Sequence, residues 1–180
     1  MPELRDFLSS YRLKTLHFPL YSSDVATVIP LHSVLHDLPS EHLAHLKEVS
    51  IQAFDRAIYD IDLGAIFKAA PNLQYARFPQ GRITLSRETL DDLAQCRLAP
   101  YLKWLTTGNI AKPFDFLEMI ELRQKYAQEH VDSQMTHLGP SPLKYLWVCV
   151  DHDKYNSEEM RVNRTIIENL RIQFRLFAHR

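Results

Sequence analysis

The sequence predicts an α/β fold in which parallel strands alternate with helices, and three observations lead to this expectation. A six-residue pattern recurs, in which leucine precedes lysine or glutamine, any residue, a mostly aliphatic residue, any residue and usually a second apolar residue. It begins at Leu13, Leu46, Leu73, Leu102 and Leu143. These starts are 33, 27, 29 and 41 residues apart, and helical patterns occupy the intervals. A strand motif that returns at this interval is typical of a solenoid, because each unit buries its apolar face only against its neighbours.

The composition is that of an ordinary globular protein. Hydrophobic residues make up 46% of the 180 residues and charged residues 24%, which is usual for a soluble domain. A formal net charge of −1 gives no global field that would attract nucleic acid or a membrane, so we expect neither partner. No apolar run is long enough to span a membrane, and no signal peptide is recognisable. Cys96 and Cys149 lie in apolar segments as expected buried thiols, which favours an intracellular protein, cytoplasmic or nuclear.

Five strands are expected where the pattern recurs. They lie near residues 14–19, 47–52, 74–78, 103–107 and 144–150. Within the first of them, Leu16 and Phe18 alternate with Thr15 and His17. Because successive side chains of a strand point to opposite faces, one face of each strand is apolar and the other is polar or aromatic.

Start and stop residues place three helices between these strands. The helices are expected over residues 63–70, from Ser86 to about Arg97, and from Pro113 to about His130. Asp60 or Asp62 can cap the first, and Ser86 can cap the second. Pro71 ends the first helix, and Pro113 fits the first position of the third. In the stretch 21–37, which contains Val28-Ile29-Pro30-Leu31, either a short extra strand or an irregular loop precedes a helical turn.

The C-terminal segment is compatible with two structures. Asn156 and Glu159 form a plausible capping pair for a helix over about 157–178, and an apolar stripe continues from Ile166 to Phe177. The shorter stretch 170–176 also alternates with period two, as a strand would. We favour the helix, because its stripe begins earlier and runs longer, and we treat residues 1–180 as one domain.

The repeated unit followed by a helix resembles the leucine-rich repeats of the long, helix-containing subtype. The segments Ala69-Ala-Pro-Asn-Leu73 and Leu98-Ala-Pro-Tyr-Leu102 stand just before strands. They are similar to the segment that closes each helix in fungal F-box proteins with leucine-rich repeats. The resemblance covers about Leu13 to Val150. It implies a short leucine-rich-repeat solenoid, with about five parallel strands on the concave side, helices on the convex side and a C-terminal helix.

The same resemblance has a functional implication. F-box proteins serve as substrate receptors of ubiquitin ligases and bind a Skp-type adaptor through their F-box module. We find no F-box segment before Leu13. We therefore expect a plain protein-binding module, and keep the ubiquitin-ligase substrate receptor as the alternative.

The candidate binding site lies on the strand residues between the inward apolar ones. These residues are Thr15, His17, Glu48, Ser50, Tyr75, Arg77, Trp104, Thr106, Tyr145 and Trp147. Neighbouring parallel strands lie about 4.8 Å apart. Tyr75, Trp104 and Tyr145 should therefore form a row, with Arg77 and Trp147 one step along the strands.

Tyrosine, tryptophan and arginine are the types that dominate binding hot spots. We therefore predict that a protein partner contacts Tyr75, Arg77, Trp104, Tyr145, Trp147, Glu48 and His17. In the alternative arrangement, the C-terminal segment or an adjacent loop covers these aromatic residues.

No catalytic or metal-binding pattern stands out. His32 and His36, and likewise His42 and His45, could share a helix face, but Pro39 interrupts the helix between the pairs and zinc needs three or four ligands. The sequence Asp151-His152-Asp153 is more typical of a solvated turn. We therefore expect no enzyme, no metal and no cofactor. A remote alternative is a His/Asp-dependent hydrolase, which requires at least three of His32, His36, Asp151, His152 and Asp153 in one pocket.

Overall fold

The chain folds into a parallel sheet with helices on one face. The computed structural model describes residues 14–20, 29–30, 43–53, 59–133, 139–151 and 173–179. The strands are β1 Thr15–Leu20, β2 Ile29–Pro30, β3 Glu48–Ala53, β4 Tyr59–Asp62, β5 Tyr75–Thr84, β6 Trp104–Ile110, β7 Tyr145–Asp151 and β8 Gln173–His179. The helices in these ranges are α4 Leu63–Ala69, α5 Arg87–Ala94 and α6 Pro113–Ser133. The coarse α/β class with a parallel sheet is thus confirmed.

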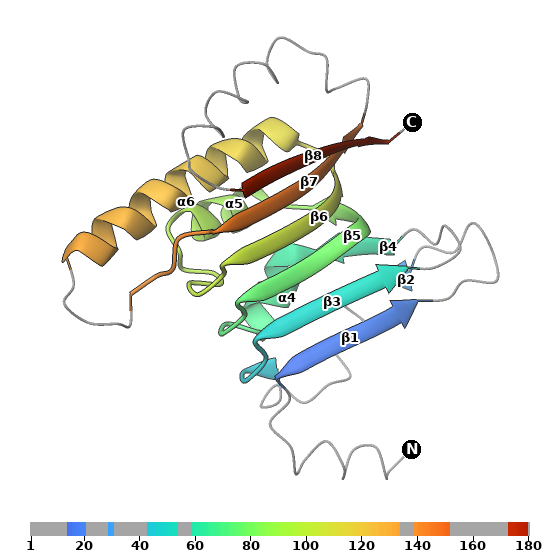
Figure 1. Ribbon diagram of the computed structural model, residues 1–180, viewed down its shortest axis with the longest axis horizontal. Coiled ribbons are helices and arrows are strands. Elements are labelled where there is room, and N and C mark those ends of the chain that lie inside the picture. The colour runs from blue at the N-terminus through green and yellow to red at the C-terminus, as the bar shows by residue number, and fades with distance from the viewer. Residues whose placement is uncertain are drawn as a thin grey trace.

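The main path of the sheet follows the order β1-β3-β5-β6-β7-β8. The short strand β4 pairs with the second half of β5, and β2 pairs with β4. In the view of Figure 1, α4 and α5 lie behind the sheet, and α6 packs against α5. No helix in the described part of the chain combines the length and the apolar character needed to cross a membrane.

Strands occupy all five positions that the repeated pattern predicts. β1, β3, β5, β6 and β7 each begin one residue later than expected, and β5 and β6 run further than expected. Consecutive strands in this series of five pair in parallel. The local pattern therefore located the strands to within a residue at their starts.

The pattern also repeats in the backbone hydrogen bonds just before each strand. The carbonyl of Lys14 accepts from the N–H groups of Lys47 and Glu48, at 2.8 and 3.0 Å. The equivalent carbonyls of the next three units each accept from the same two positions of the following unit. These acceptors are Lys47, Gln74 and Lys103. The carbonyl of the residue after the leading leucine thus makes the same pair of backbone hydrogen bonds in successive units.

The core lies between the sheet and the helices. The leading leucines Leu46, Leu73, Leu102 and Leu143 are at most 2% exposed. The alternate strand residues, such as Val49, Phe78 and Leu146, are buried with them. Helix residues complete this core, including Phe67, Leu90, Leu93, Phe116 and Ile120. The sheet's other face is thereby left to the polar and aromatic strand residues.

The predicted helix starts are confirmed. Asp62, rather than Asp60, caps α4, and its carboxylate accepts from the N–H of Ala65 at 3.1 Å. Ser86 caps α5 in the same way, by accepting from the N–H of Thr89 at 3.1 Å. Pro113 is the first residue of α6.

Helix α5 ends at Ala94, three residues before the expected Arg97, and the chain beyond it is held by a buried arginine. Arg123 of α6 is 1% exposed. Its guanidinium donates to the carbonyls of Leu93 at 3.0 Å, Leu98 at 3.3 Å and Ala99 at 2.7 Å. This segment includes Cys96 and Ala99 with φ of 54° and 45°. Left-handed backbone is unfavourable for both residue types, so the hydrogen bonds help hold the segment in this conformation.

The thiol of Cys96 is buried, as predicted, while the side chain of Cys149 lies outside the described residues. Burial raises the pKa of the Cys96 thiol, and the nearby Arg123 partly opposes this shift. The thiol therefore stays protonated at neutral pH and packs as a small apolar group.

The expectation of a C-terminal helix is wrong for residues 173–179. This segment is strand β8, and it pairs in parallel with β7 from Tyr145↔Gln173 to Asp151↔His179. Without β8, the N–H and C=O groups along the outer side of β7 would have no strand partner. Pairing at this edge overrides the helical stripe and agrees with the period-two alternation. Residues 157–172 of the expected helix lie outside the described residues.

The sequence did not predict β4, and it left β2 open between strand and loop. Two strands, β3 and β4, pair with β5 on the same side. The first residues of β5 pair with β3, and Gly81 to Thr84 pair with β4. The partner of β5 changes from β3 to β4 between Arg77 and Gly81, and its register with β6 shifts in the same stretch, between Phe78 and Arg82.

Gly108 lies where this irregularity brings β5 and β6 close together. A Cβ atom at Gly108 would lie 2.1 Å from the carbonyl oxygen of Gly81 and 2.6 Å from its nitrogen. Gly108→Ala should therefore lower the free energy of unfolding by about 1–3 kcal/mol, because only a backbone shift can relieve this overlap. Urea denaturation measures the change. A variant as stable as the parent would show that the two strands do not approach this closely.

Candidate functional site

Two rows of side chains cross the sheet on the face opposite the helices. The first row joins Thr15, Glu48, Tyr75, Trp104 and Tyr145 in register from β1 to β7. The second row joins His17, Ser50, Arg77, Thr106 and Trp147. This is the register that the sequence predicts, with Arg77 and Trp147 one step along the strands from the first row.

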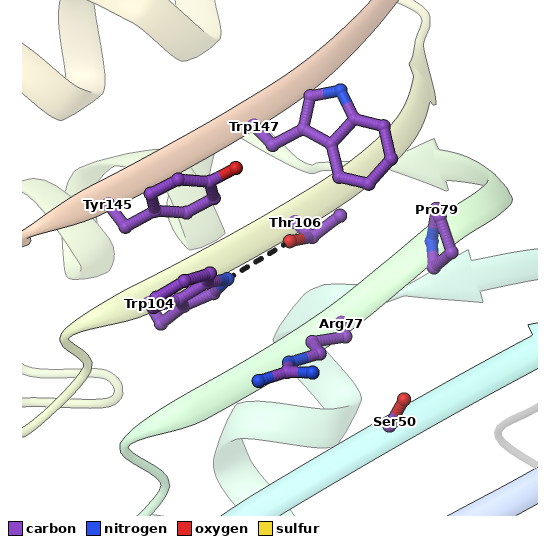
Figure 2. A pocket seen from close by; sticks show the side chains of 7 residues that line it. All are labelled: Ser50, Arg77, Pro79, Trp104, Thr106, Tyr145 and Trp147. Carbon is purple, nitrogen blue, oxygen red and sulfur yellow. Dashed lines mark hydrogen bonds between the residues drawn. The ribbon is translucent and has the colours of Figure 1, made fainter. Parts of the chain in front are cut away.

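The centre of the first row is an aromatic stack. The rings of Trp104 and Tyr145 lie 3.8 Å apart between centroids and 23° from parallel. The guanidinium carbon of Arg77 lies 5.4 Å from the centroid of the Trp104 ring, which allows a cation–π interaction. In Figure 2, Arg77 and Tyr145 lie on opposite sides of Trp104. The indole is thus held between a cation and a second ring.

Polar contacts fix the orientation of this cluster. The indole nitrogen Nε1 of Trp104 donates to Oγ1 of Thr106 at 3.2 Å, and Thr106 is buried. Arg77 Nε lies 3.9 Å from Glu48 Oε1, and the two side chains are 46% and 25% exposed. An ion pair this long and this exposed contributes less than about 1 kcal/mol. The guanidinium therefore remains available to a ligand.

These side chains surround a hollow on the sheet. The hollow encloses about 260 Å³ and is lined by Ser50, Arg77, Pro79, Trp104, Thr106, Tyr145 and Trp147 (Figure 2). Pockets for whole small-molecule ligands usually enclose about 300–1,000 Å³. This one is therefore better suited to one or two side chains of a larger partner.

Four of the predicted site residues come together here, and three lie outside the hollow. Arg77, Trp104, Tyr145 and Trp147 line it. Glu48 contacts Arg77 from the neighbouring strand, and Tyr75 lies in register with Trp104. His17 is exposed on β1, which is separated from β5 by β3.

Pro79 lines the hollow although the sequence does not predict it there, because the expected strand ends at Phe78. A longer strand would have placed Pro79 on the same face as Tyr75 and Arg77, since alternate residues share a face. Ser50 and Thr106 were placed on this face, but they were not included among the predicted contact residues.

Trp104, Tyr145 and Trp147 are each partly exposed. In the alternative arrangement, the C-terminal segment covers the aromatic row. The backbone of β8 does not do this, because β8 extends the sheet beside β7 (Figure 1).

The described lining of the hollow includes no histidine, cysteine or carboxylate. Across the described side chains, no three histidine, cysteine or acidic residues gather in a way that could hold a metal ion. Of the residues named for the hydrolase alternative, His32, His36, His152 and Asp153 lie outside the described residues, and only the backbone of Asp151 is described.

A comparison with models of known protein families, with curated proteins and with solved structures found no match. The geometry of the sheet face is therefore the basis for assigning a function.

Proposed function

We propose that this chain is a non-enzymatic binding protein that recognises a segment of a partner protein on the open face of its sheet. The observation that carries the proposal is the hollow formed by Arg77, Trp104, Tyr145 and Trp147. These residue types dominate the energetics of protein interfaces, and they are clustered here around a space of side-chain size.

The cluster is also well prepared for binding. Each side chain projects from a strand that is paired on both sides, and Trp104 is held by Tyr145, Arg77 and Thr106. Side chains that are already ordered lose little conformational entropy when a partner arrives. The binding energy of the aromatic contacts is therefore not spent on ordering the site.

We further propose that the repeated units form a short leucine-rich-repeat solenoid with this face on its concave side. Two observations support this architecture: the hydrogen bonds that recur before successive strands, and the burial of the leading leucines Leu46, Leu73, Leu102 and Leu143. Concave sheet faces of solenoids are extended binding surfaces. This assignment agrees with the position of the hollow opposite the helices.

The proposal is tested by crosslinking at the site. A photoreactive p-benzoylphenylalanine replaces Trp147, and a control variant carries it at Leu122 of α6, which is 49% exposed. A protein crosslinked from the Trp147 position but not from the Leu122 position is expected. Equal crosslinking from both positions, or none from Trp147, would contradict the proposal.

The affinity of the crosslinked partner gives a quantitative prediction. Trp104→Ala should weaken its binding by about 2 kcal/mol or more, because the substitution removes the central ring of the cluster. Calorimetry with the purified partner measures the change. Leu122→Ala should leave the affinity unchanged, and a Trp104→Ala variant that binds as well as the parent would place the binding energy elsewhere.

A further inference from the structure

A row of lysines runs along the sheet edge where the strands begin. Lys14, Lys47, Lys103 and Lys144 each precede the first residue of a strand, and Gln74 occupies the fifth equivalent position. The backbone hydrogen bonds described above connect these positions in succession across the sheet. Lys14, Lys47 and Lys144 are exposed, and Lys103 is partly exposed.

The lysine row is adjacent to the aromatic row. Lys103 and Lys144 immediately precede Trp104 and Tyr145 in sequence, so their Cα atoms are about 3.8 Å from those of the two aromatic residues. Adjacent strands lie about 4.8 Å apart. The backbone positions of these two lysines therefore border the stack at the strand starts, and Arg77 lies over the Trp104 ring.

The residues of the two rows and the lysine edge carry a net positive charge, whereas the whole chain is close to neutral. The described residues of the two rows and the lysine edge include the cations Lys14, Lys47, Arg77, Lys103 and Lys144 and one carboxylate, Glu48. The described ion pairs involve none of the four lysines. The whole chain has a formal net charge of −1. The excess of cations is thus local to the two rows and the adjoining strand starts.

The orientation of the Trp104 ring favours one class of anionic partner. Arg77 lies over one face of the Trp104 indole and Tyr145 stacks on the other, so a ligand meets the edge of this ring (Figure 2). Aromatic edges carry partial positive charge, which attracts carboxylate oxygens. Single-stranded nucleic acids bind instead by stacking bases on open ring faces. With a sequence pI of about 6.8, the chain also lacks the strongly basic character of most nucleic-acid-binding domains.

We infer that the partner segment recognised on this face is acidic. In this arrangement its carboxylates lie against Lys103, Lys144 and Arg77, and an apolar side chain enters the hollow between Trp104 and Trp147. The inference rests on the proposed function, since it names the chemistry of the partner at the same site.

A random-peptide selection tests the acidic chemistry directly. A library of short random peptides is selected on the intact protein, and peptides that also bind the Trp104→Ala variant are removed. Enrichment of aspartate and glutamate over the unselected library is expected, together with at least one apolar residue. Enriched peptides that are neutral or basic would overturn the acidic chemistry while supporting a peptide-binding face.

Fluorescence then measures the contribution of charge. The chain has two tryptophans, Trp104 and Trp147, and both line the hollow, so its intrinsic emission reports on this site. The enriched peptide should bind K103Q/K144Q about threefold to tenfold more weakly than the parent, since two exposed charge pairs are lost. The matched control K68Q/K112Q removes two exposed lysines elsewhere and should not change the affinity.

Two further outcomes would overturn the inference. One is a glutamine-substituted version of the enriched peptide that binds as tightly as the acidic one. The other is a single-stranded oligouridylate that binds more tightly than the acidic peptide and competes with it. A failed selection would also contradict the acidic chemistry, whereas crosslinking of a partner from the Trp147 position would still support the proposed function.

Discussion

Arg123→Ala is expected to lower the free energy of unfolding by about 3–5 kcal/mol, because it removes three hydrogen bonds from a buried charged donor and leaves a cavity beside the end of α5. Three of these carbonyls, those of Leu93, Leu98 and Ala99, lie within 3.3 Å of the guanidinium. A hydrogen bond from a charged donor contributes about 1.5–3 kcal/mol. The carbonyls of Leu93 and Ala99 also accept from the N–H groups of Cys96 and Leu102, which limits the loss. Part of this loss is offset, because burial of the guanidinium is itself unfavourable and lowers the pKa of Arg123. Urea denaturation followed by circular dichroism measures the remainder.

Two further substitutions separate the charge from the hydrogen bonds. Arg123→Lys keeps the positive charge, but a single ammonium cannot reach all the carbonyls that the two guanidinium NH2 groups reach. It should therefore recover less than half of the lost unfolding free energy. Arg123→Met fills most of the volume and supplies no donor. If Arg123→Met is as stable as the parent, the carbonyls do not depend on this arginine.

In the sequence, Arg123 is a charged residue at a position where the helical pattern predicts an apolar one. It lies three residues after Ile120 and four before Ala127, on the face of α6 that the apolar pattern assigns to the core. A buried arginine needs several acceptors, and the carbonyls that accept here belong to a segment about 25 residues away in the chain. Periodicity indicates the burial, but it does not identify the partners.

Strands that a local sequence pattern specifies were predictable. Strands that form only by pairing with a distant segment were not. The leading leucine and the alternation after it determine β1, β3, β5, β6 and β7 one unit at a time. Strand β8 forms where the exposed edge of β7 offers hydrogen bonds to the segment 173–179. Strand β4 forms beside a part of β5 that lies beyond the repeated pattern. Both are consequences of pairing between distant segments.

The candidate site divides in the same way. Side-chain alternation and parallel register were enough to align Tyr75, Trp104 and Tyr145. The stacking of Trp104 on Tyr145 depends on side-chain rotamers, which no sequence pattern specifies. The contribution of Pro79 depends on how far β5 continues past Phe78. The sequence therefore predicted the face and its register, whereas the hollow required the structure.

Leu102→Ala is expected to cost about 2–5 kcal/mol of unfolding free energy, far more than Trp104→Ala two residues later. Leu102 is 2% exposed and packs in the core between sheet and helices, so its truncation leaves a cavity. Leu73→Ala and Leu143→Ala should fall in the same range, because these residues occupy the same position in their units and are equally buried.

Trp104→Ala should cost only about 1–2.5 kcal/mol, because this side chain is partly exposed on the opposite face. The losses are its stacking on Tyr145, which contributes about 0.5–1.5 kcal/mol, and its contact with Arg77, which contributes about 0.5–1 kcal/mol at an exposed site. Urea denaturation of both variants, followed by circular dichroism, compares them directly, and Leu122→Ala on exposed α6 should stay within about 0.5 kcal/mol of the parent. A loss in Trp104→Ala as large as that in Leu102→Ala would mean that the aromatic row stabilises the fold as core residues do. The open face would then lose its strongest argument as a binding surface, since a side chain needed for folding has little freedom to serve a partner.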